Sequence, residues 1–376
     1  MKKKIIFLVN TDSFLISHRL PIADKMLKSG YEVHIATEFS KYKNRLLRKG
    51  FKVHNINFNR NSINILKSLF VFFQIFYLIF KVRPDIFHLI ALKPIIFGGL
   101  VSFIFPIKLL VFSITGLGSM FIKNSFFYKI KSNFFTFLYR IVFLNSNLKV
   151  ILQNNDDLKY LTSKAKLNKN KVIIIRGSGV NLNDFKYSKI SKKFPIILMA
   201  SRLIKDKGVI EFIEAAKYLK KKNFKGIFYL VGDVDYNNPS AVSKNLIHLS
   251  HKKKIIRYFK YNKNIFRFIK QATIIVLPSY REGFPKILME AAACGRPIIT
   301  TNVPGCKDTI INNKTGILVP SKNYRALADA INKLSQDKKK LEKFAFETRK
   351  FAVANFDIKD VISKHYSIYK KIENIK

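Results

Sequence analysis

Cysteine and tryptophan are almost missing from this sequence, which has two cysteines and no tryptophan in 376 residues. The pair Cys294 and Cys306 builds neither a disulfide framework nor a zinc-binding pattern. Such usage is typical of proteins of the reducing cytoplasm. We therefore expect a cytoplasmic protein folded around apolar cores, without cross-links or a structural metal.

Acidic residues are scarce as well: 23 Asp and Glu stand against 69 Lys and Arg, for a net charge of +46. The excess divides evenly between residues 1–190 and 191–376, so it is not a basic tail. It favours anionic partners, namely membrane lipids, phosphorylated substrates or nucleic acid. A lysine-biased composition of solvated faces explains the total equally well, and charge alone does not decide between the two.

Several familiar nucleotide motifs are missing. Gly116-Leu117-Gly118 and Gly177-Ser178-Gly179 each lack the third glycine of G-x-G-x-x-G, and there is no P-loop. Helix-turn-helix, zinc-finger and RNP motifs are missing too. A nicotinamide dehydrogenase, a P-loop enzyme and a sequence-specific nucleic-acid binder are therefore not supported.

No apolar run is clean enough for a membrane span of roughly 20 uncharged residues. Ile65–Val82 contains Lys67 and is expected to form a long, half-buried helix. Ile95–Ile114 is interrupted by Pro106 and reads as a helix, a turn and a strand. The apolar run Ile5–Val9 is too short for a signal peptide, and no small-residue cleavage site follows it, so a first buried strand explains it better.

What is present is an alternation of short apolar strands with helical segments, in two series. Continuous apolar strands are typical of parallel sheets covered on both faces. The first series of expected strands is Ile5–Val9, Glu32–Ala36, His54–Phe58, Ile86–Leu89, Leu109–Ser113, Lys149–Leu152 and Val172–Ile175. The second is Pro195–Met199, Ile227–Val231, Lys254–Arg257, Ile274–Leu277, Pro297–Thr300 and Gly316–Val319.

This pattern predicts an α/β chain with two doubly wound, Rossmann-like domains. We place the N-terminal domain at 1–190 and the C-terminal domain at 191–355, because the sequence becomes rich in polar residues around Asn181–Lys193. The segment 356–376 is expected to be a helix that packs back on the N-terminal domain.

Two segments of the C-terminal half carry candidate chemistry. Arg202 and Lys207 follow an expected strand and precede a helix, so they would point into the crevice at the strand ends. A guanidinium fork and an ammonium suit a diphosphate. Two basic residues on a surface loop are the plain alternative.

In the second segment, Glu282 falls in a loop and Glu290 one to two turns into a helix that starts near Pro285. The N–H groups at such a helix start can hold a phosphate, and carboxylates are good partners for sugar hydroxyls. A pair of structural or solvated glutamates is the alternative.

The order of these motifs resembles glycosyltransferase family 4, a retaining family of the GT-B fold, and is similar to bacterial O-antigen and polysaccharide glycosyltransferases. The resemblance covers residues 195–320 well. It rests on Ser201-Arg202-Leu203, Lys207-Gly208, Gly232-Asp233, Pro278-Ser279, Glu282-Gly283-Phe284-Pro285, Glu290-Ala291, Gly295-Arg296-Pro297, Gly305, Asn313 and Thr315-Gly316.

The resemblance implies two Rossmann-like domains facing a central cleft, with the donor in the C-terminal one. Arg202 and Lys207 would bind the donor diphosphate and stabilise the departing charge. Glu290 would contact the nucleotide ribose and Glu282 the transferred sugar, while the backbone of residues Gly283, Phe284 and Pro285 lines the phosphate. No cofactor or metal is expected, because basic side chains and the helix end supply the electrostatics.

The N-terminal half is the acceptor side in that family. Its first loop is similar to the family's, although it lacks the double glycine of many relatives, and Ser113 to Gly116 stand where some relatives have a functional histidine. His18 is the best remaining catalytic candidate; a helix-capping role is the alternative. The acceptor-side candidates are Asn10, Asp12, His18, His88, Lys93, Thr115 and Gly116, with a buried structural role as the alternative for His88.

Between Met120 and Asn145, aromatic residues alternate with Lys and Arg at near-helical spacing, which suits a helix lying on an anionic bilayer or an ordinary core helix with basic outer positions. We therefore expect a hexosyltransferase that moves sugar from a nucleotide diphosphate, UDP in the first place, to a polyprenyl-diphosphate-linked glycan at the inner face of the cytoplasmic membrane. A sugar-nucleotide epimerase of the same fold and a non-catalytic polyanion- or membrane-binding protein are the alternatives.

Overall fold

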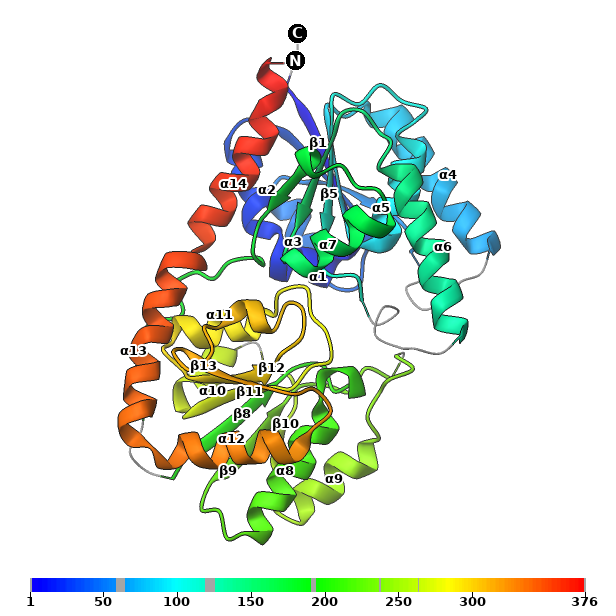
Figure 1. The fold of residues 1–376 in the computed structure, drawn as a ribbon. Coiled ribbons are helices and arrows are strands. Elements are labelled where there is room, and N and C mark those ends of the chain that lie inside the picture. Colours follow the sequence, from blue (N-terminus) through cyan, green and yellow to red (C-terminus); the bar gives the residue numbers. More distant parts are fainter. Residues whose placement is uncertain are drawn as a thin grey trace. The chain divides into compact units, whose positions relative to one another are not determined.

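The computed structural model describes residues 2–58, 65–118, 126–190, 194–236, 238–262 and 264–374. The chain divides into two compact α/β units (Figure 1). Unit 1 comprises Met1–Ser178 and Lys359–Lys376, and unit 2 comprises Gly179–Ile358. Unit 2 thus begins before the polar stretch at residue 190, because Leu182, Phe185 and Ile190 pack against its core despite their polar neighbours.

Unit 1 contains a seven-stranded parallel sheet in the order β3-β2-β1-β4-β5-β6-β7. Its strands are β1 (Lys4–Thr11), β2 (Glu32–Glu38), β3 (Lys52–Asn55), β4 (Ile86–Ile90), β5 (Leu109–Ile114), β6 (Leu148–Leu152) and β7 (Val172–Ile174). Successive residues of a strand point to opposite faces. Ile6 and Leu8 accordingly enter one core, and Ile5, Phe7 and Val9 enter the other.

Helices cover both faces of this sheet, as two apolar faces require. Helices α4, α5, α6 and α7 supply the first core, and α1, α2, α3 and α14 supply the second. Their bounds are α1 (Asp12–His18), α2 (Leu20–Lys28), α3 (Lys43–Arg48), α4 (Ile65–Val82), α5 (Leu92–Val101), α6 (Phe126–Val142), α7 (Asn155–Lys164) and α14 (Ile358–Lys370). The predicted long helix is α4, whereas the part of the predicted amphipathic helix before Phe126 lies outside the described residues.

Unit 2 has a six-stranded parallel sheet in the order β10-β9-β8-β11-β12-β13. The strands are β8 (Ile196–Ala200), β9 (Ile227–Val231), β10 (Arg257–Phe259), β11 (Ile274–Leu277), β12 (Ile298–Thr301) and β13 (Gly316–Val319). The helices are α8 (Val209–Lys221), α9 (Lys244–Lys252), α10 (Ile265–Gln271), α11 (Lys286–Ala293), α12 (Tyr324–Gln336) and α13 (Lys338–Asn355). The predicted doubly wound architecture is confirmed in both units.

Two predicted strands are misplaced. The run His54–Phe58 was expected to be a strand, but β3 ends at Asn55. Ile56 and Phe58 are buried from a loop, so their apolar character reflects burial without strand pairing. The run Lys254–Arg257 was also wrong, because β10 begins at Arg257. Both strands lie at a sheet edge. A strand there pairs with one neighbour instead of two, so the apolar pattern in its sequence is weaker.

Each sheet has one point at which the strand order reverses. It lies between β1 and β4 in unit 1 and between β8 and β11 in unit 2. Ligands of open α/β sheets bind outside the carboxyl ends of the strands at such a point. The segments that follow these four strands are therefore where a ligand is expected to bind.

Candidate functional site

The loops after β8 and β11 bring the candidate donor residues of unit 2 together. Lys205–Lys207 form a single 3₁₀ turn that ends at Gly208, whose φ is +76°. A Cβ at this glycine would overlap the carbonyl oxygen of Pro278. Only glycine therefore lets the turn that carries Lys207 lie directly against the loop after β11.

Hydrogen bonds tie the same two loops together. The carbonyl oxygen of Asp206 accepts the Ser279 hydroxyl at 3.0 Å and the Tyr280 N–H at 2.9 Å. The result is an ion pair between residues far apart in sequence: Lys207 Nζ lies 2.5 Å from Glu282 Oε1. Their side chains are only 19% and 11% exposed, so water screens the pair weakly. Sequence reasoning selected both residues but not their contact.

A third loop supports Glu282 from behind. The N–H of Glu282 donates to the carbonyl oxygen of Pro304 at 3.1 Å. Gly305 has a φ of +80°, and a Cβ there would overlap the carbonyl oxygens of Glu282 and Gly283. This glycine, which carries no functional group, therefore sets the position of the Glu282 backbone.

Arg202 forms an ion pair of its own, separate from the Lys207–Glu282 pair. Its Nη1 donates to Asp235 Oδ2 at 2.9 Å, and its side chain is 45% exposed. Because an exposed ion pair is weak, a phosphate could replace the carboxylate at little cost. Asp235 was not among the predicted site residues, although it lies three residues after Gly232 in the family-like pattern.

Asp233 and Asp235 also form an Asp-x-Asp triplet. This triplet is relevant to the prediction that the site needs no metal. Asp233 Oδ1 accepts the N–H of Tyr261 at 3.1 Å, and Asp235 pairs with Arg202. Across the part of the chain that the structure describes, no group of three or more His, Cys, Asp or Glu side chains could hold a metal ion.

Glu290 is a buried carboxylate on α11. The helix begins at Lys286, directly after Pro285, and no side chain caps its N-terminus. Glu290 is the fifth helical residue, 6% exposed, with Lys286 Nζ 3.4 Å from its Oε1. Burial raises its pKa, against the opposing effect of the Lys286 ammonium. Gly283, Phe284 and Pro285 are buried just before the helix, and their role in lining a phosphate stays a prediction.

In unit 1, α1 follows β1 directly, and its first residue, Asp12, holds the loop after β2. Its carboxylate accepts the N–H groups of Ser40, Lys41 and Tyr42 at 2.9–3.0 Å. Burial raises the pKa of Asp12, but these hydrogen bonds outweigh burial and lower it overall. With its oxygens committed to the loop after β2, Asp12 holds the backbone and is not available to an acceptor.

His18 is the last residue of α1 and is partly exposed. Its ring stacks on Phe14, with ring centroids 4.3 Å apart, and its Nδ1 lies 2.6 Å from the hydroxyl of Ser17. Asn10 lies at the end of β1, with its side-chain oxygen buried and without a partner among the described residues. The acceptor-side roles of His18 and Asn10 stay predictions.

His88 lies in the interior, where no acceptor can reach it. Its Nε2 is 2.7 Å from the hydroxyl of Ser113, and its Nδ1 is 2.7 Å from the hydroxyl of Tyr369. Burial lowers its pKa well below the usual value, so the ring is neutral. The predicted acceptor role of His88 gives way to the structural alternative, because both ring nitrogens are occupied.

The remaining acceptor candidates follow β4 and β5. Half-buried Lys93 donates to the carbonyl oxygen of Phe58 at 3.0 Å, and burial lowers its pKa. Thr115 and Gly116 directly follow β5. Sequence reasoning missed Ala91, whose φ of +75° and ψ of +170° are strained for a residue with a side chain. Such strain concentrates at functional positions, and Ala91 lies at the point where the strand order reverses.

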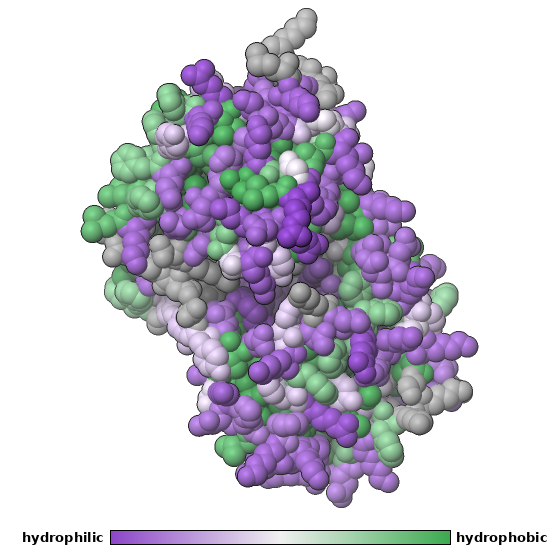
Figure 2. Space-filling model, turned by 180° about the vertical axis from the view of Figure 1, so that it is seen from behind, coloured by the Kyte–Doolittle hydropathy of each residue, from purple (hydrophilic) through white to green (hydrophobic). Residues whose placement is uncertain are grey.

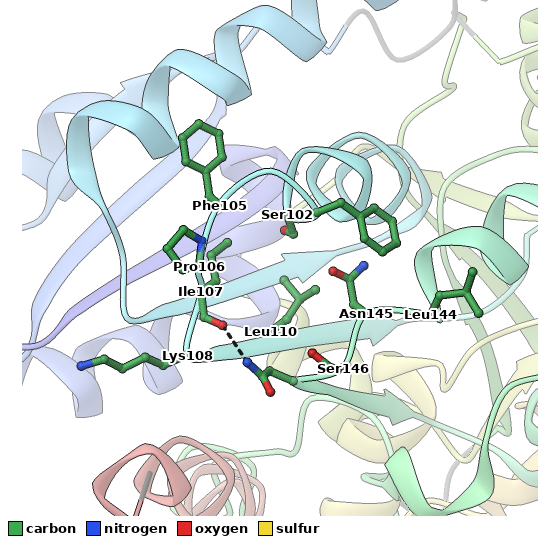
Figure 3. A pocket seen from close by; sticks show the side chains of 11 residues that line it. Ser102, Phe105, Pro106, Ile107, Lys108, Leu110, Leu144, Asn145 and Ser146 are labelled. Atoms are coloured by element: carbon green, nitrogen blue, oxygen red, sulfur yellow. Dashed lines mark hydrogen bonds between the residues drawn. The ribbon is translucent and has the colours of Figure 1, made fainter. Parts of the chain in front are cut away.

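A cavity of unit 1 lies away from these strand ends. It has a volume of about 480 Å³ and is lined by the loops that follow α5 and α6, from Ser102 to Lys108 and from Leu144 to Asn147 (Figure 3). These loops lead into β5 and β6, so the cavity lies at the strand starts. Because ligands of such sheets bind at the opposite edge, we do not assign the cavity to the reaction.

Comparison with known proteins identifies a family for each unit. Residues 180–351 match the family model described as glycosyl transferases group 1, and residues 4–155 match the one described as glycosyl transferase 4-like. In unit 2, the matched segment contains every donor-site residue named above.

Three curated relatives are bacterial enzymes of glycan synthesis. The chain is 29% identical to N,N'-diacetylbacillosaminyl-diphospho-undecaprenol alpha-1,3-N-acetylgalactosaminyltransferase of Campylobacter jejuni, over 98% of this chain and 99% of that protein. It is 25% identical to capsular polysaccharide biosynthesis glycosyltransferase CapM of Staphylococcus aureus, over 98% and 97%. It is 23% identical to UDP-Gal:alpha-D-GlcNAc-diphosphoundecaprenol alpha-1,3-galactosyltransferase of Escherichia coli, over 74% and 73%.

Solved structures share the fold. A glycosyltransferase from Rickettsia africae matches with a TM-score of 0.76 at 21% identity, over 99% of this chain and 98% of that chain. Sucrose-phosphate synthase from Thermosynechococcus elongatus matches with a TM-score of 0.82 at 17% identity, over 100% of both chains. Both units together therefore form the two-domain GT-B fold.

Proposed function

The chain belongs to the glycosyltransferases that join a transferase 4-like domain to a group 1 domain, and from this premise we propose that it is a retaining, metal-independent UDP-sugar transferase. The acceptor we propose is a glycan linked to a polyprenyl diphosphate, in the synthesis of a surface polysaccharide. The names of two relatives support this acceptor, since both specify a sugar carried on a diphosphate of undecaprenol. One of them also specifies a UDP-sugar donor.

The observation that carries the proposal is the partly buried Lys207–Glu282 pair at the strand-order reversal of unit 2. An ammonium held there can neutralise the charge that grows on a departing diphosphate. Arg202 can add a second cation, and the uncapped start of α11 offers backbone N–H groups to a phosphate. The carboxylate of Glu282, beside the ammonium, can accept a hydroxyl of the transferred sugar.

The test uses UDP, GDP, ADP and their common sugars as ligands of the purified protein, with and without EDTA. Because a ligand that binds the folded state raises its apparent stability, we expect UDP compounds alone to raise the unfolding midpoint, by the same amount in EDTA. Incubation with a short-chain polyprenyl-diphosphate N-acetylhexosamine and the best UDP-sugar should then give an α-linked product by NMR. A β-linked product, dependence on metal, or conversion of the sugar nucleotide without acceptor would each contradict part of the proposal.

We also propose that unit 1 works at an anionic membrane surface. The exposed large apolar residues of α4 fall three or four positions apart, which places them along one helical stripe: Leu66, Leu69, Phe70, Phe73, Tyr77 and Phe80. Those of α6 do the same: Phe126, Phe127, Ile130, Phe134 and Phe137. Apolar side chains gather along one edge of unit 1 (Figure 2).

The charge around these two stripes supports an anionic partner. Between Glu38 and Asp156 the sequence has one acidic residue, Asp85, and it pairs with Lys108 at 3.0 Å. Lys129, Lys131 and other basic residues are interleaved with the apolar ones. Helices of this kind lie in the bilayer interface without crossing it. Over the described residues, no helix has both the length and the apolar character that crossing would need.

Replacing apolar residues on both stripes should weaken membrane binding. We expect Phe73→Ser with Phe134→Ser to lower binding to vesicles of one quarter anionic lipid by about tenfold or more, since burying one Phe contributes about 1.5–3 kcal/mol. Co-sedimentation measures it. The matched control is Phe346→Ser on α13, a phenylalanine of unit 2 that is 64% exposed. Equal losses in the control, or none in the double variant, would count against the surface.

A further inference from the structure

Arg19 is a buried cation that the proposed reaction does not use. It lies between α1 and α2 and is 1% exposed. Burial lowers the pKa of its guanidinium to about 10, which still leaves it charged at neutral pH. A guanidinium has five N–H donors. Here Nη1 donates to the carbonyl oxygen of His18 at 3.2 Å, and Nε has no partner among the described residues.

The groups around Arg19 come from the far end of the sequence. His365 and Tyr369 are one turn apart on α14 and fully buried, and both interact electrostatically with Arg19. Tyr369 is fixed in turn: its hydroxyl is 2.7 Å from His88 Nδ1, and its ring meets Phe7 edge-on at 6.3 Å. Helix α14 packs into the same apolar core as Leu20, the residue that follows Arg19.

These neighbours give Arg19 no counter-charge. Burial lowers the pKa of His365 to about 3 and raises that of Tyr369, so both are neutral at pH 7. Burying an uncompensated charge is costly, and an apolar side chain of similar size is often more stable in such a place. Core packing alone therefore does not explain an arginine here, whereas its bond to His18 offers an explanation.

That bond lies at the end of α1. The carbonyl oxygen of His18 lies at the C-terminus of α1, where helix carbonyls lack intrahelical partners and carry partial negative charge. The buried guanidinium lies beside this carbonyl oxygen and can stabilise the conformation in which α1 ends. The ring of His18, stacked on Phe14, belongs to the same last turn of α1 and is partly exposed.

We propose that Arg19 is a positioning residue, held by α14, that fixes α1 and His18 for the acceptor. The proposal rests on the proposed function in one respect, since it takes α1 as part of the acceptor side. Under this proposal the segment after residue 358 has a role in acceptor use, although it is far from His18 in the sequence.

The experiment compares Arg19→Met, which fills the space without charge, with Arg19→Lys and Tyr369→Phe. We expect Arg19→Met to raise the KM for the lipid-linked acceptor about tenfold and to leave the KM for the UDP-sugar within twofold, since the donor residues are in unit 2. Arg19→Lys should recover part of the loss. In Arg19→Ala, guanidinium ions should restore acceptor use, whereas sodium should not. Equal changes in both KM values, or wild-type kinetics, would overturn the proposal.

Hydrogen exchange gives a readout that does not need transferase activity. Amides of α1 in Arg19→Met and Tyr369→Phe should exchange about tenfold faster than in the wild type, while amides of β8 and α11 should keep their rates. If α1 is unchanged, the positioning role is wrong even for an active transferase. If α1 loosens but no acceptor is used by the wild type, it is the proposed function that fails.

Discussion

Lys207→Ala should lower kcat by about a hundred- to a thousandfold, the usual effect of removing one preorganised donor from a developing negative charge. The ammonium lies in a site that is mostly closed to water, and its contact with Glu282 fixes it before substrate arrives. Its effect should therefore fall on the chemical step, with a smaller rise in the KM for the donor. Steady-state kinetics with saturating acceptor measure both constants.

The control for Lys207→Ala is Lys205→Ala, two residues earlier in the same turn. Lys205 is exposed and is not part of the Lys207–Glu282 pair. A loss caused by the general charge of the loop would appear in both variants, whereas a loss caused by the placed ammonium appears in one. Turnover of Lys207→Ala within about threefold of the wild type would remove this pair from the mechanism.

Glu290→Gln should make unit 2 more stable at pH 7 and at the same time weaken UDP binding by about ten- to a hundredfold. Burial of Glu290 raises its pKa, so ionising it in the folded protein costs more than in the unfolded chain. Glutamine has nearly the same volume and no charge. It loses the charge-assisted hydrogen bonds that a carboxylate can accept from ribose hydroxyls, each contributing about 1.5–3 kcal/mol.

The pH dependence tests the stability part separately. A raised folded-state pKa means that the folded protein binds more protons, so the wild type loses stability as pH rises from the unfolded value of 4.5 through the folded pKa. The gain in unfolding midpoint for Glu290→Gln should thus be full above that window and vanish below it. Glu214→Gln, on the exposed side of α8, is the control. A midpoint gain that does not change with pH would contradict this account.

Most helices and strands whose positions follow from the local pattern of residues could be predicted from the sequence. The strand Ile227–Val231 and the helix Ile65–Val82 have the predicted bounds, because continuous burial and helical periodicity can be recognised from neighbouring residues. The edge strand β10 was misplaced for lack of that signal. Lys207 and Glu282 were both selected, since each follows a strand that ends at the same edge of the sheet.

What the sequence could not supply were partners distant along the chain. Asp12 resembled a substrate ligand until its three N–H donors from the loop after β2 were known. His88 resembled an acceptor contact, although its partner is Tyr369, 281 residues later. Polar residues near strand ends can serve either substrate or backbone, and only the three-dimensional arrangement separates the two uses.

Unit 1 is built from two separate segments of the chain, and this affects how the protein folds during its synthesis. Its sheet is complete once residue 178 has left the ribosome, yet the apolar face around Phe7 and Val111 is covered in part by α14. Unit 2, by contrast, is one continuous segment and can finish folding as soon as it has emerged. The unit that is translated first is thus the last to be completed. Until then its uncovered face is a surface on which chaperones can act and on which nascent chains can aggregate.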